Sequence, residues 1–270
     1  MSKNFVLSHN KDKYRNPILF HSHDFYEIYF FVDGDVRYYV ENDDYDLKKG
    51  DVLLIPPGKL HRPVIDDNSI YERYVLWILD PFIENNSGIC RLIDEINQLA
   101  KEKNTHLVSM GDEEQRYLKY MLDKTLQDIS IDGNTEEYIS ESCIMLILDE
   151  LRHKFRNTIK TENEQGDIIR QVIVYLNRNY TKNPSLDELS EVFFVSKYYL
   201  LHKFKEYTKT TIHNYILMKK INLAKELLKK EIPPQMVCEK CGFSTYSNFY
   251  KAFIERTGIS PGKYRKQTTG

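Results

Sequence analysis

LDELSEV at residues 186–192 and SKYYLLHKFKEYT at 196–208 form a pattern that returns as PQMVCEKC at 234–241 and STYSNFYKAFIERT at 244–257. The longer segments of the two copies align at a constant offset of 49 residues. This offset pairs Leu200 with Phe249, Phe204 with Phe253, Thr208 with Thr257, and Tyr215 with Tyr264. Each copy predicts a short helix, a tight break and a longer helix, the pattern of a helix-turn-helix motif. Two such motifs on one rigid unit present two reading helices to one face of a DNA duplex.

The charge of the chain is divided between its two ends. Residues 168–270 hold 18 Lys and Arg against 8 Asp and Glu, a net charge of +10, whereas the rest holds 20 against 32, a net charge of −12. Only the carboxyl-terminal part therefore has the sign that binds DNA phosphates. Such an asymmetry indicates that the two ends have separate tasks.

Two further helices complete the basic part. Residues 168–180 place Ile169, Val172, Ile173 and Leu176 on one face. Residues 211–230 predict one continuous helix between the motifs, and some 18 to 20 helical residues span about 27–30 Å. This length approaches the distance of about 34 Å between successive major grooves.

The same periodicity divides each reading helix into an inner and an outer face. Leu200 and Phe204 are predicted to enter the core, as are Phe249 and Phe253 in the second copy. The residues predicted to meet DNA are Lys197, Tyr198, Leu201, His202, Lys205, Thr245, Tyr246, Ser247, Tyr250 and Lys251.

The amino-terminal part, residues 1–82, has the composition of a strand domain. Stretches rich in Tyr, Phe, Ile and Val predict strands at 25–32, 36–40, 51–55, 64–66 and 71–79. The first two are separated by Asp33-Gly34-Asp35, a hairpin signal. Short strands at this spacing predict a β-barrel or β-sandwich.

Four side chains in this part have the chemistry of a ligand or metal site. His21 and His23 share a face if they lie on one strand, and Glu27 and His61 supply a carboxylate and a third imidazole. Three interpretations stay open: structural or surface histidines, a metal-free small-molecule pocket, and a metal ion. Trp77 on the last strand offers stacking surface to a sugar, or serves as an ordinary core aromatic.

Between the two parts, residues 83–156 change to helical periodicity. Three apolar stripes are predicted, formed by Cys90, Leu92, Ile93, Ile96 and Leu99, by Tyr117, Tyr120, Met121, Leu122 and Leu126, and by Tyr138, Ile139, Cys143, Ile144, Leu146, Ile147 and Leu151. The third is wide, so it either covers the barrel or pairs with a second subunit. We favour a homodimer built on these helices.

The cysteines and the remaining segments favour a cytoplasmic protein. The four cysteines are too few and too scattered for a disulfide framework, and no apolar run has the length of a membrane span. Cys238 and Cys241 form a CxxC pattern, which is a redox pair, half a zinc site or, as we expect, core packing. Residues 157–166 are polar and end in Gly166, as expected of a linker.

These motifs carry a family resemblance. Residues 167–266 resemble the AraC-type DNA-binding domain in the segments 184–189, 196–200, 204–205, 221–228, 241–244, 248–253 and 257–265. Residues 23–28 and 50–61 resemble the cupin-like sensor half of the same family, although Ile65 stands where the second cupin motif has a polar residue. Where family members place an Arg that enters the major groove, this chain has His202 and Lys251, neither of which offers a bidentate guanidinium.

The sequence thus predicts an α+β multidomain protein. Its parts are a cupin-like β-barrel (1–82), a helical region (83–156), a linker (157–166) and an all-α tandem helix-turn-helix domain (167–270). The resemblance implies a transcriptional regulator, an activator rather than an enzyme, that binds double-stranded DNA, a small-molecule effector such as a carbohydrate, and RNA polymerase. No cofactor is expected. The alternative is a metal-dependent cupin enzyme with a DNA-binding tail, whose iron or manganese would be held by His21, His23, Glu27 and His61.

Overall fold

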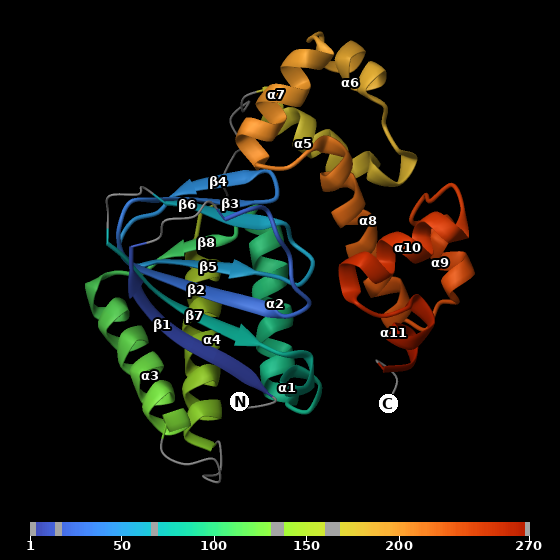
Figure 1. Ribbon diagram of the computed structural model, residues 1–270. Helices are drawn as coiled ribbons and strands as arrows, with labels where there is room; N and C mark the ends of the chain where they lie inside the picture. Colours follow the sequence, from blue (N-terminus) through green and yellow to red (C-terminus); the bar gives the residue numbers. More distant parts are fainter. Residues whose placement is uncertain (1–3, 14–17, 66–69, 131–137, 160–167, 268–270) are drawn as a thin grey trace. The chain divides into compact units, whose positions relative to one another are not determined.

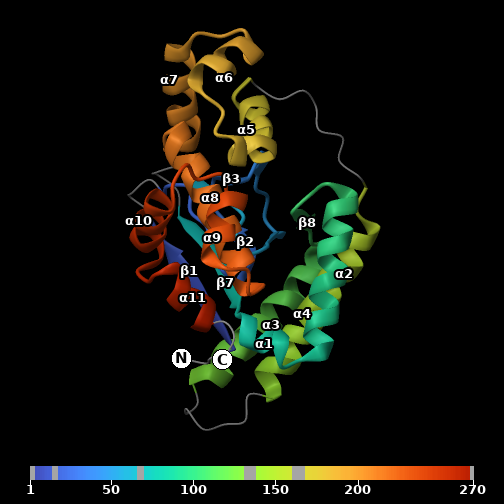
Figure 2. The same cartoon turned by 90° about the vertical axis from the view of Figure 1, so that its right-hand side faces the viewer.

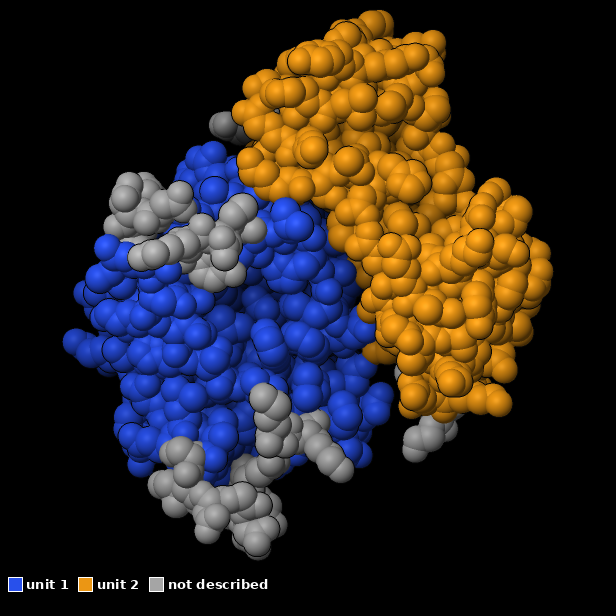
Figure 3. Space-filling model, viewed as in Figure 1, with its two compact units in different colours: residues 1–164 blue, residues 165–270 orange. Residues whose placement is uncertain are grey.

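The chain forms two compact units, residues 1–164 and 165–270, which are coloured separately in Figure 3. The computed structural model describes residues 4–13, 18–65, 70–130, 138–159 and 168–267. The predicted linker at 157–166 lies outside the described residues from residue 160 onward.

The first unit contains two antiparallel sheets (Figure 1). The larger sheet has the strand order β1 (Phe5–Asp12), β7 (Tyr71–Ile78), β2 (Tyr26–Asp33), β5 (Asp51–Ile55) and β8 (Leu107–Ser109). The smaller sheet has the order β4 (Asp43–Asp46), β3 (Val36–Val40) and β6 (His61–Ile65). The predicted β-rich fold is confirmed, and the hairpin between β2 and β3 turns at Gly34, whose φ is +133°.

An inner core lies between the two sheets. Tyr29 and Phe31 of β2 are buried in it together with Tyr38 of β3 and Tyr71 of β7. The hydroxyl groups of Tyr29 and Tyr71 hydrogen bond to each other. These aromatic side chains fill the space between the sheets.

Four helices cover the outer face of the larger sheet, as the two perpendicular views show (Figures 1 and 2). They are α1 (Asp80–Glu84), α2 (Ser87–Lys103), α3 (Asp112–Ser130) and α4 (Tyr138–Asn157). The strand residues that alternate with the inner core, such as Ile28 and Phe30, pack against these helices. The wide apolar stripe of α4 therefore covers the sheet, one of the two roles predicted for it.

The structure corrects several details of the predicted first unit. Strands β1, β4 and β8 were not predicted, and β8 interrupts the region expected to be helical throughout. The stripe predicted on α3 is confirmed for Met121, Leu122 and Leu126, which lie in or against the core. It is wrong for Tyr117 and Tyr120, which are exposed, and Leu118 takes their place in the core. Strand β6 begins at His61 rather than at residue 64, and residue 66 lies outside the described residues.

The second unit is all helical, as predicted. Its elements are α5 (Ile168–Asn179), the short 3-10 helix η1 (Tyr180–Lys182), α6 (Leu186–Phe193), α7 (Lys197–Thr208), α8 (Ile212–Lys229), α9 (Pro234–Lys240), α10 (Tyr246–Thr257) and α11 (Pro261–Gln267). Helices α6 and α7 form the first helix-turn-helix motif, and α9 and α10 form the second. We call these the first and second heads, with α5 and α11 packed on the first and second respectively.

Each head has its own apolar core. The first is built on Leu189, Leu200 and Phe204, which are completely buried. In the second, Phe249 and Phe253 pack with the thiols of Cys238 and Cys241. The core-packing interpretation of the CxxC pattern is therefore confirmed, and burial raises the pKa of the Cys241 thiol to about 12.

Candidate DNA interface and ligand site

The outer face of α7 carries the predicted DNA-binding residues of the first head. The helix begins after Ser196, whose hydroxyl accepts the N–H of Tyr199 at 3.1 Å. With Leu200 and Phe204 buried, the opposite face is exposed and presents Lys197, Tyr198, Leu201, His202 and Lys205. Tyr198 is 79% exposed, so its ring is available to a partner.

Two of these residues have contacts within the first head. Lys197 forms an ion pair with Asp187 of α6, and His202 Nδ1 lies 3.8 Å from a carboxylate oxygen of Glu206. Both pairs are largely exposed, so a DNA phosphate can compete for the Lys197 ammonium at little cost.

Helix α10 repeats this arrangement in the second head. Thr245 caps the helix by accepting the N–H of Asn248 at 3.2 Å. Ser247, Tyr250 and Lys251 are exposed, whereas Tyr246 is half-buried against the ring of Phe249.

Sequence reasoning missed one residue on this face. Asn248 is exposed and lies one turn before Lys251, with its amide donating to the hydroxyl of Ser244 at 3.3 Å. Its spacing of three residues from Lys251 was a usable signal. An exposed amide on a reading helix is well suited to bidentate hydrogen bonding with adenine.

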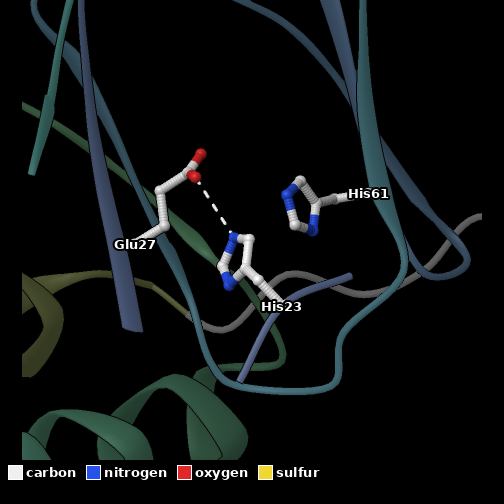
Figure 4. Close-up of side chains that lie close together, drawn as sticks. All are labelled: His23, Glu27 and His61. Atoms are coloured by element: carbon white, nitrogen blue, oxygen red, sulfur yellow. Dashed lines mark hydrogen bonds and ion pairs between the residues drawn. The ribbon is translucent and has the colours of Figure 1, made fainter. Parts of the chain in front are cut away.

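The first unit brings three of the four predicted site residues together. The ligand atoms of His23, Glu27 and His61 all lie within 4.8 Å of one another (Figure 4). Glu27 lies on β2, and His61 begins β6 in the other sheet. His23 precedes β2 and lies outside the strands, and the chain bends at Asp24 and Phe25, so His21 and His23 do not share a strand.

Glu27 is a buried carboxylate with three neighbouring hydrogen-bond partners. Its Oε2 accepts the indole N–H of Trp77 at 2.9 Å and lies 3.2 Å from His23 Nε2, and its Oε1 accepts the hydroxyl of Tyr38 at 3.2 Å. Burial by itself raises the pKa of Glu27, but the hydrogen bonds with His23 and Trp77 and the neighbouring imidazoles outweigh it and lower the pKa. The carboxylate is therefore ionised at neutral pH.

His61 presents a buried nitrogen to this carboxylate. Its Nδ1 lies 2.8 Å from the carbonyl oxygen of Lys59, whereas Nε2 is buried and has no hydrogen-bond partner among the described residues. Burial lowers the pKa of His61 to about 4, so the ring is neutral at pH 7. Because Nδ1 donates to the carbonyl, the lone pair of Nε2 faces the cluster.

His23 lies between two acceptors. Its Nδ1 is 2.9 Å from the carbonyl oxygen of Phe25, and its Nε2 faces Glu27. Two arrangements satisfy this geometry: a doubly protonated ring paired with Glu27, or a cation bound between Nε2 and the carboxylate. The residues present therefore fit a metal ion, since two imidazoles oriented by backbone carbonyls and one carboxylate form a common transition-metal ligand set.

The other two predicted ligand residues lie beside the cluster. His21 forms an isolated β-bridge with His61, its ring is exposed, and its Nδ1 bonds to the carbonyl of Leu19 at 2.9 Å. Trp77 is 36% exposed, and its ring packs against that of Phe25 in a tilted arrangement with centroids 4.9 Å apart. Trp77 thus orients Glu27 through its N–H and still exposes part of its ring.

A separate cavity of about 490 Å³ in the first unit has a lining rich in polar side chains and does not include the cluster. Its wall is formed by Tyr26, Glu41, Asn42, Asp43, Pro56, Lys59, Asn97, Ala100, Lys101, Asn104, Thr105 and His106. Burial lowers the pKa of His106 to about 4, so this ring is neutral. Sequence reasoning missed the cavity because its residues come from four separate segments.

The comparisons with known proteins agree with both units. Residues 13–112 match the AraC-like ligand binding domain, and residues 189–267 match a helix-turn-helix domain. The transcriptional activator AarP of Providencia stuartii is 30% identical over 107 residues, which are 39% of this chain and 79% of AarP. The HTH-type transcriptional regulator YdiP of Escherichia coli (strain K12) is 25% identical over 253 residues, 89% of this chain and 78% of YdiP.

Among solved structures, ToxT of Vibrio cholerae is 15% identical and covers 99% of this chain and 100% of its own, with a TM-score of 0.39. In the described part of the chain, no helix combines the length and apolar character needed to cross a membrane.

A basic double helix-turn-helix unit joined to a β-rich ligand-binding unit defines a ligand-responsive transcriptional regulator. The chain belongs to the AraC family of DNA-binding regulators. Its relatives are named as transcriptional regulators, which favours a regulator over the alternative of a metal-dependent cupin enzyme.

Proposed function

We propose that this regulator senses a neutral, hydroxyl-rich small molecule, such as a carbohydrate, in the polar cavity of its first unit. The cavity has a volume suited to a small ligand. Its charged side chains, Glu41, Asp43, Lys59 and Lys101, balance in sign, which favours a neutral ligand over an ion. Tyr26 adds an aromatic wall, and three amides in the lining supply both donors and acceptors.

The observation that carries this proposal is the combination of balanced charge and many hydrogen-bonding groups in one cavity. A thermal-shift screen of sugars and sugar acids tests it, because a ligand at 100 times its Kd adds about 2.7 kcal/mol to stability. Asn97 lines the cavity and donates to Tyr26 at 2.8 Å. Asn97→Ala should abolish the ligand-dependent shift, whereas Gln98→Ala, on the exposed side of the same helix, should keep it. A shift that survives Asn97→Ala places the effector elsewhere.

The cluster of His23, Glu27 and His61 supports a second candidate, a bound transition-metal ion. The specific observation is the buried, unpartnered Nε2 of His61, which faces an ionised carboxylate. Titration with Co(II), followed by its visible absorption, tests this directly. His61→Ala should remove the signal, and His153→Ala, at an exposed site on α4, should not. Without any Co(II) signal, the His23–Glu27 ion pair is structural.

The effector assignment of His21, His23, Glu27, His61 and Trp77 stays a prediction alongside these two candidates. Trp77→Ala distinguishes an effector bound against the cluster from one bound in the polar cavity. Loss of a sugar-induced thermal shift in this variant, with Asn97→Ala unaffected, would place the effector against the cluster and not in the polar cavity.

The regulator is further proposed to act as a homodimer. Tyr120 of α3 and Ile139 of α4 are each 56% exposed, and Leu146 is 44% exposed. These residues line a groove of about 510 Å³ on the face of α3 and α4 that points away from the sheet. A second copy of this chain is the occupant that this continuous apolar surface fits. Sedimentation at micromolar concentration should show a dimer, and Ile139→Lys should give a monomer.

Binding of the effector should favour one arrangement of the regulator over another and thereby change transcription. We expect activation through contact with RNA polymerase, since relatives such as AarP are named activators. Transcription in vitro from its target promoter, with and without effector, measures the sign of this change.

A further inference from the structure

Three segments of the second unit meet at one buried lysine. Lys220 lies near the middle of α8 and is only 4% exposed. Its Nζ donates to the carbonyl oxygen of Gly242 at 2.7 Å and to the side-chain oxygen of Asn183. Asn183 lies in the turn before α6, in the first head, whereas Gly242 lies between α9 and α10, in the second.

The two turns also contact each other directly. The amide of Asn183 donates to the carbonyl oxygen of Gly242 at 2.8 Å. Gly242 has a φ of +69°, and a Cβ atom at this position would collide with the carbonyl oxygen of Thr181. Only a glycine therefore allows the backbones of the two heads to approach this closely.

The ammonium group of Lys220 is buried and has no carboxylate among its hydrogen-bond acceptors in the described residues. Its two acceptors are neutral oxygens, and its ammonium also lies 4.9 Å from the centre of the Phe243 ring. Burying an ammonium away from water is costly unless its acceptors are held in place. Burial accordingly lowers the pKa of Lys220. The cost is offset only while both turns keep their positions, so the lysine favours one arrangement of the heads.

A cleft of about 760 Å³ lies between the heads beside this junction, and Asn183, Lys220 and Gly242 form part of its lining. Leu201 of α7, Ile216 of α8 and Ala252 of α10 are among the residues that line it. One further contact, from Arg256 of α10 to Asn214 of α8, is exposed to solvent and therefore contributes less. The relative position of the two reading helices thus depends on α8 and on the junction at Lys220.

We propose that Lys220 is a positioning residue that locks the two heads into one rigid block and so fixes the separation of half-sites that the regulator accepts. Two heads held in register bind as one bivalent ligand, and the second contact is then intramolecular. With 18 residues, α8 spans about 27 Å, close to the distance of about 34 Å between successive major grooves. A loosened junction would lower the effective concentration of the second head without changing what either head reads.

The test measures how tightly the full-length protein binds an intact DNA site and divided sites, in which only one half is kept. A duplex selected by the wild-type protein from a random pool serves as the probe. It is used intact, with either half scrambled, and with an insertion of about 5 base pairs, half a helical turn, between the halves. The variants are Lys220→Met, which removes the ammonium, and Asn183→Gly, which removes the side chain but tolerates the φ of +56° at that position.

Lys220→Met and Asn183→Gly should bind the intact duplex at least about tenfold more weakly, bind each half as the wild type does, and lose sensitivity to the insertion. The control Lys230→Met removes the same charge from an exposed position after α8 and should behave as the wild type on all four duplexes. Wild-type affinity for the intact duplex in both variants would overturn the proposal. An equal loss of affinity for the intact and the divided duplexes would overturn it as well, because Lys220 would then support only the folding of the unit. Should Lys220→Met fail to fold, Asn183→Gly decides between these outcomes.

Discussion

The ring of Phe253 meets the ring of Tyr264 edge to face, with centroids 5.5 Å apart and planes at 85°. Forty-nine residues earlier, Phe204 meets Tyr215 in the same way, at 5.6 Å and 87°. The hydroxyls of Thr208 and Thr257 likewise repeat the same bond, to the carbonyl oxygens of Phe204 and Phe253. The internal repeat of the sequence is therefore a repeat of side-chain packing, and each head has the same aromatic anchor.

This packing predicts that each head depends on its own phenylalanine. Phe204→Ala or Phe253→Ala should lower the free energy of unfolding by about 3–5 kcal/mol, because each removes a completely buried ring and leaves a cavity. Urea unfolding measures the loss. Tyr250→Ala, at a 40% exposed site on the same helix as Phe253, should change stability by less than about 0.5 kcal/mol. Equal losses at Phe253 and Tyr250 would contradict the assignment of the inner face.

The second unit was predicted from sequence almost completely because its signals are local. Each head places capping hydroxyls, such as Ser196 and Thr245, at the first turn of a helix and aromatic residues one turn apart. Helix ends and buried faces follow from such neighbours without knowledge of the tertiary fold.

The first unit was predicted less well because its strands pair over long distances. Strand β1 pairs with β7, so Phe5 lies opposite Ile78, and only the tertiary fold provides this partner. The cluster shows the same limit. His21 and His23 were expected to share a face of one strand, but they do not lie on one strand, and His23 meets Glu27 and His61 from two different sheets. The polar cavity had no signal in any single segment.

The exposed cation of the second reading helix predicts a change in salt dependence. Lys251→Ala should weaken binding to all DNA sequences and reduce the slope of log K against log salt by about 0.9, the value for one lost phosphate contact. Filter binding at several salt concentrations gives the slope. Lys230→Ala, which lies off the reading helices, should leave it unchanged. Should Lys251→Ala relax the preference at one base pair and keep the slope, Lys251 reads a base instead.

The cap of the second reading helix predicts a loss of stability that its hydroxyl alone explains. Thr245→Ala should cost about 1 kcal/mol, since the N–H of Asn248 loses its acceptor. Thr245→Ser retains the hydroxyl and should restore most of that stability in thermal unfolding. A Thr245→Ser variant as unstable as Thr245→Ala would show that the methyl group, and not the cap, is responsible.

The buried thiols predict which cysteine reacts in the folded protein. Because burial raises the pKa of Cys241 to about 12, its thiolate fraction at pH 8 is about one part in ten thousand, and burial also raises the pKa of Cys143 and Cys238. Cys90 is the half-exposed member of the set. Ellman's reagent should therefore label Cys90 promptly and the other three only after denaturation. Cys90→Ser should abolish the prompt phase. Rapid labelling of Cys238 or Cys241 in that variant would mean that the second head opens readily, and its core would then be too loose to hold a reading helix in a fixed register.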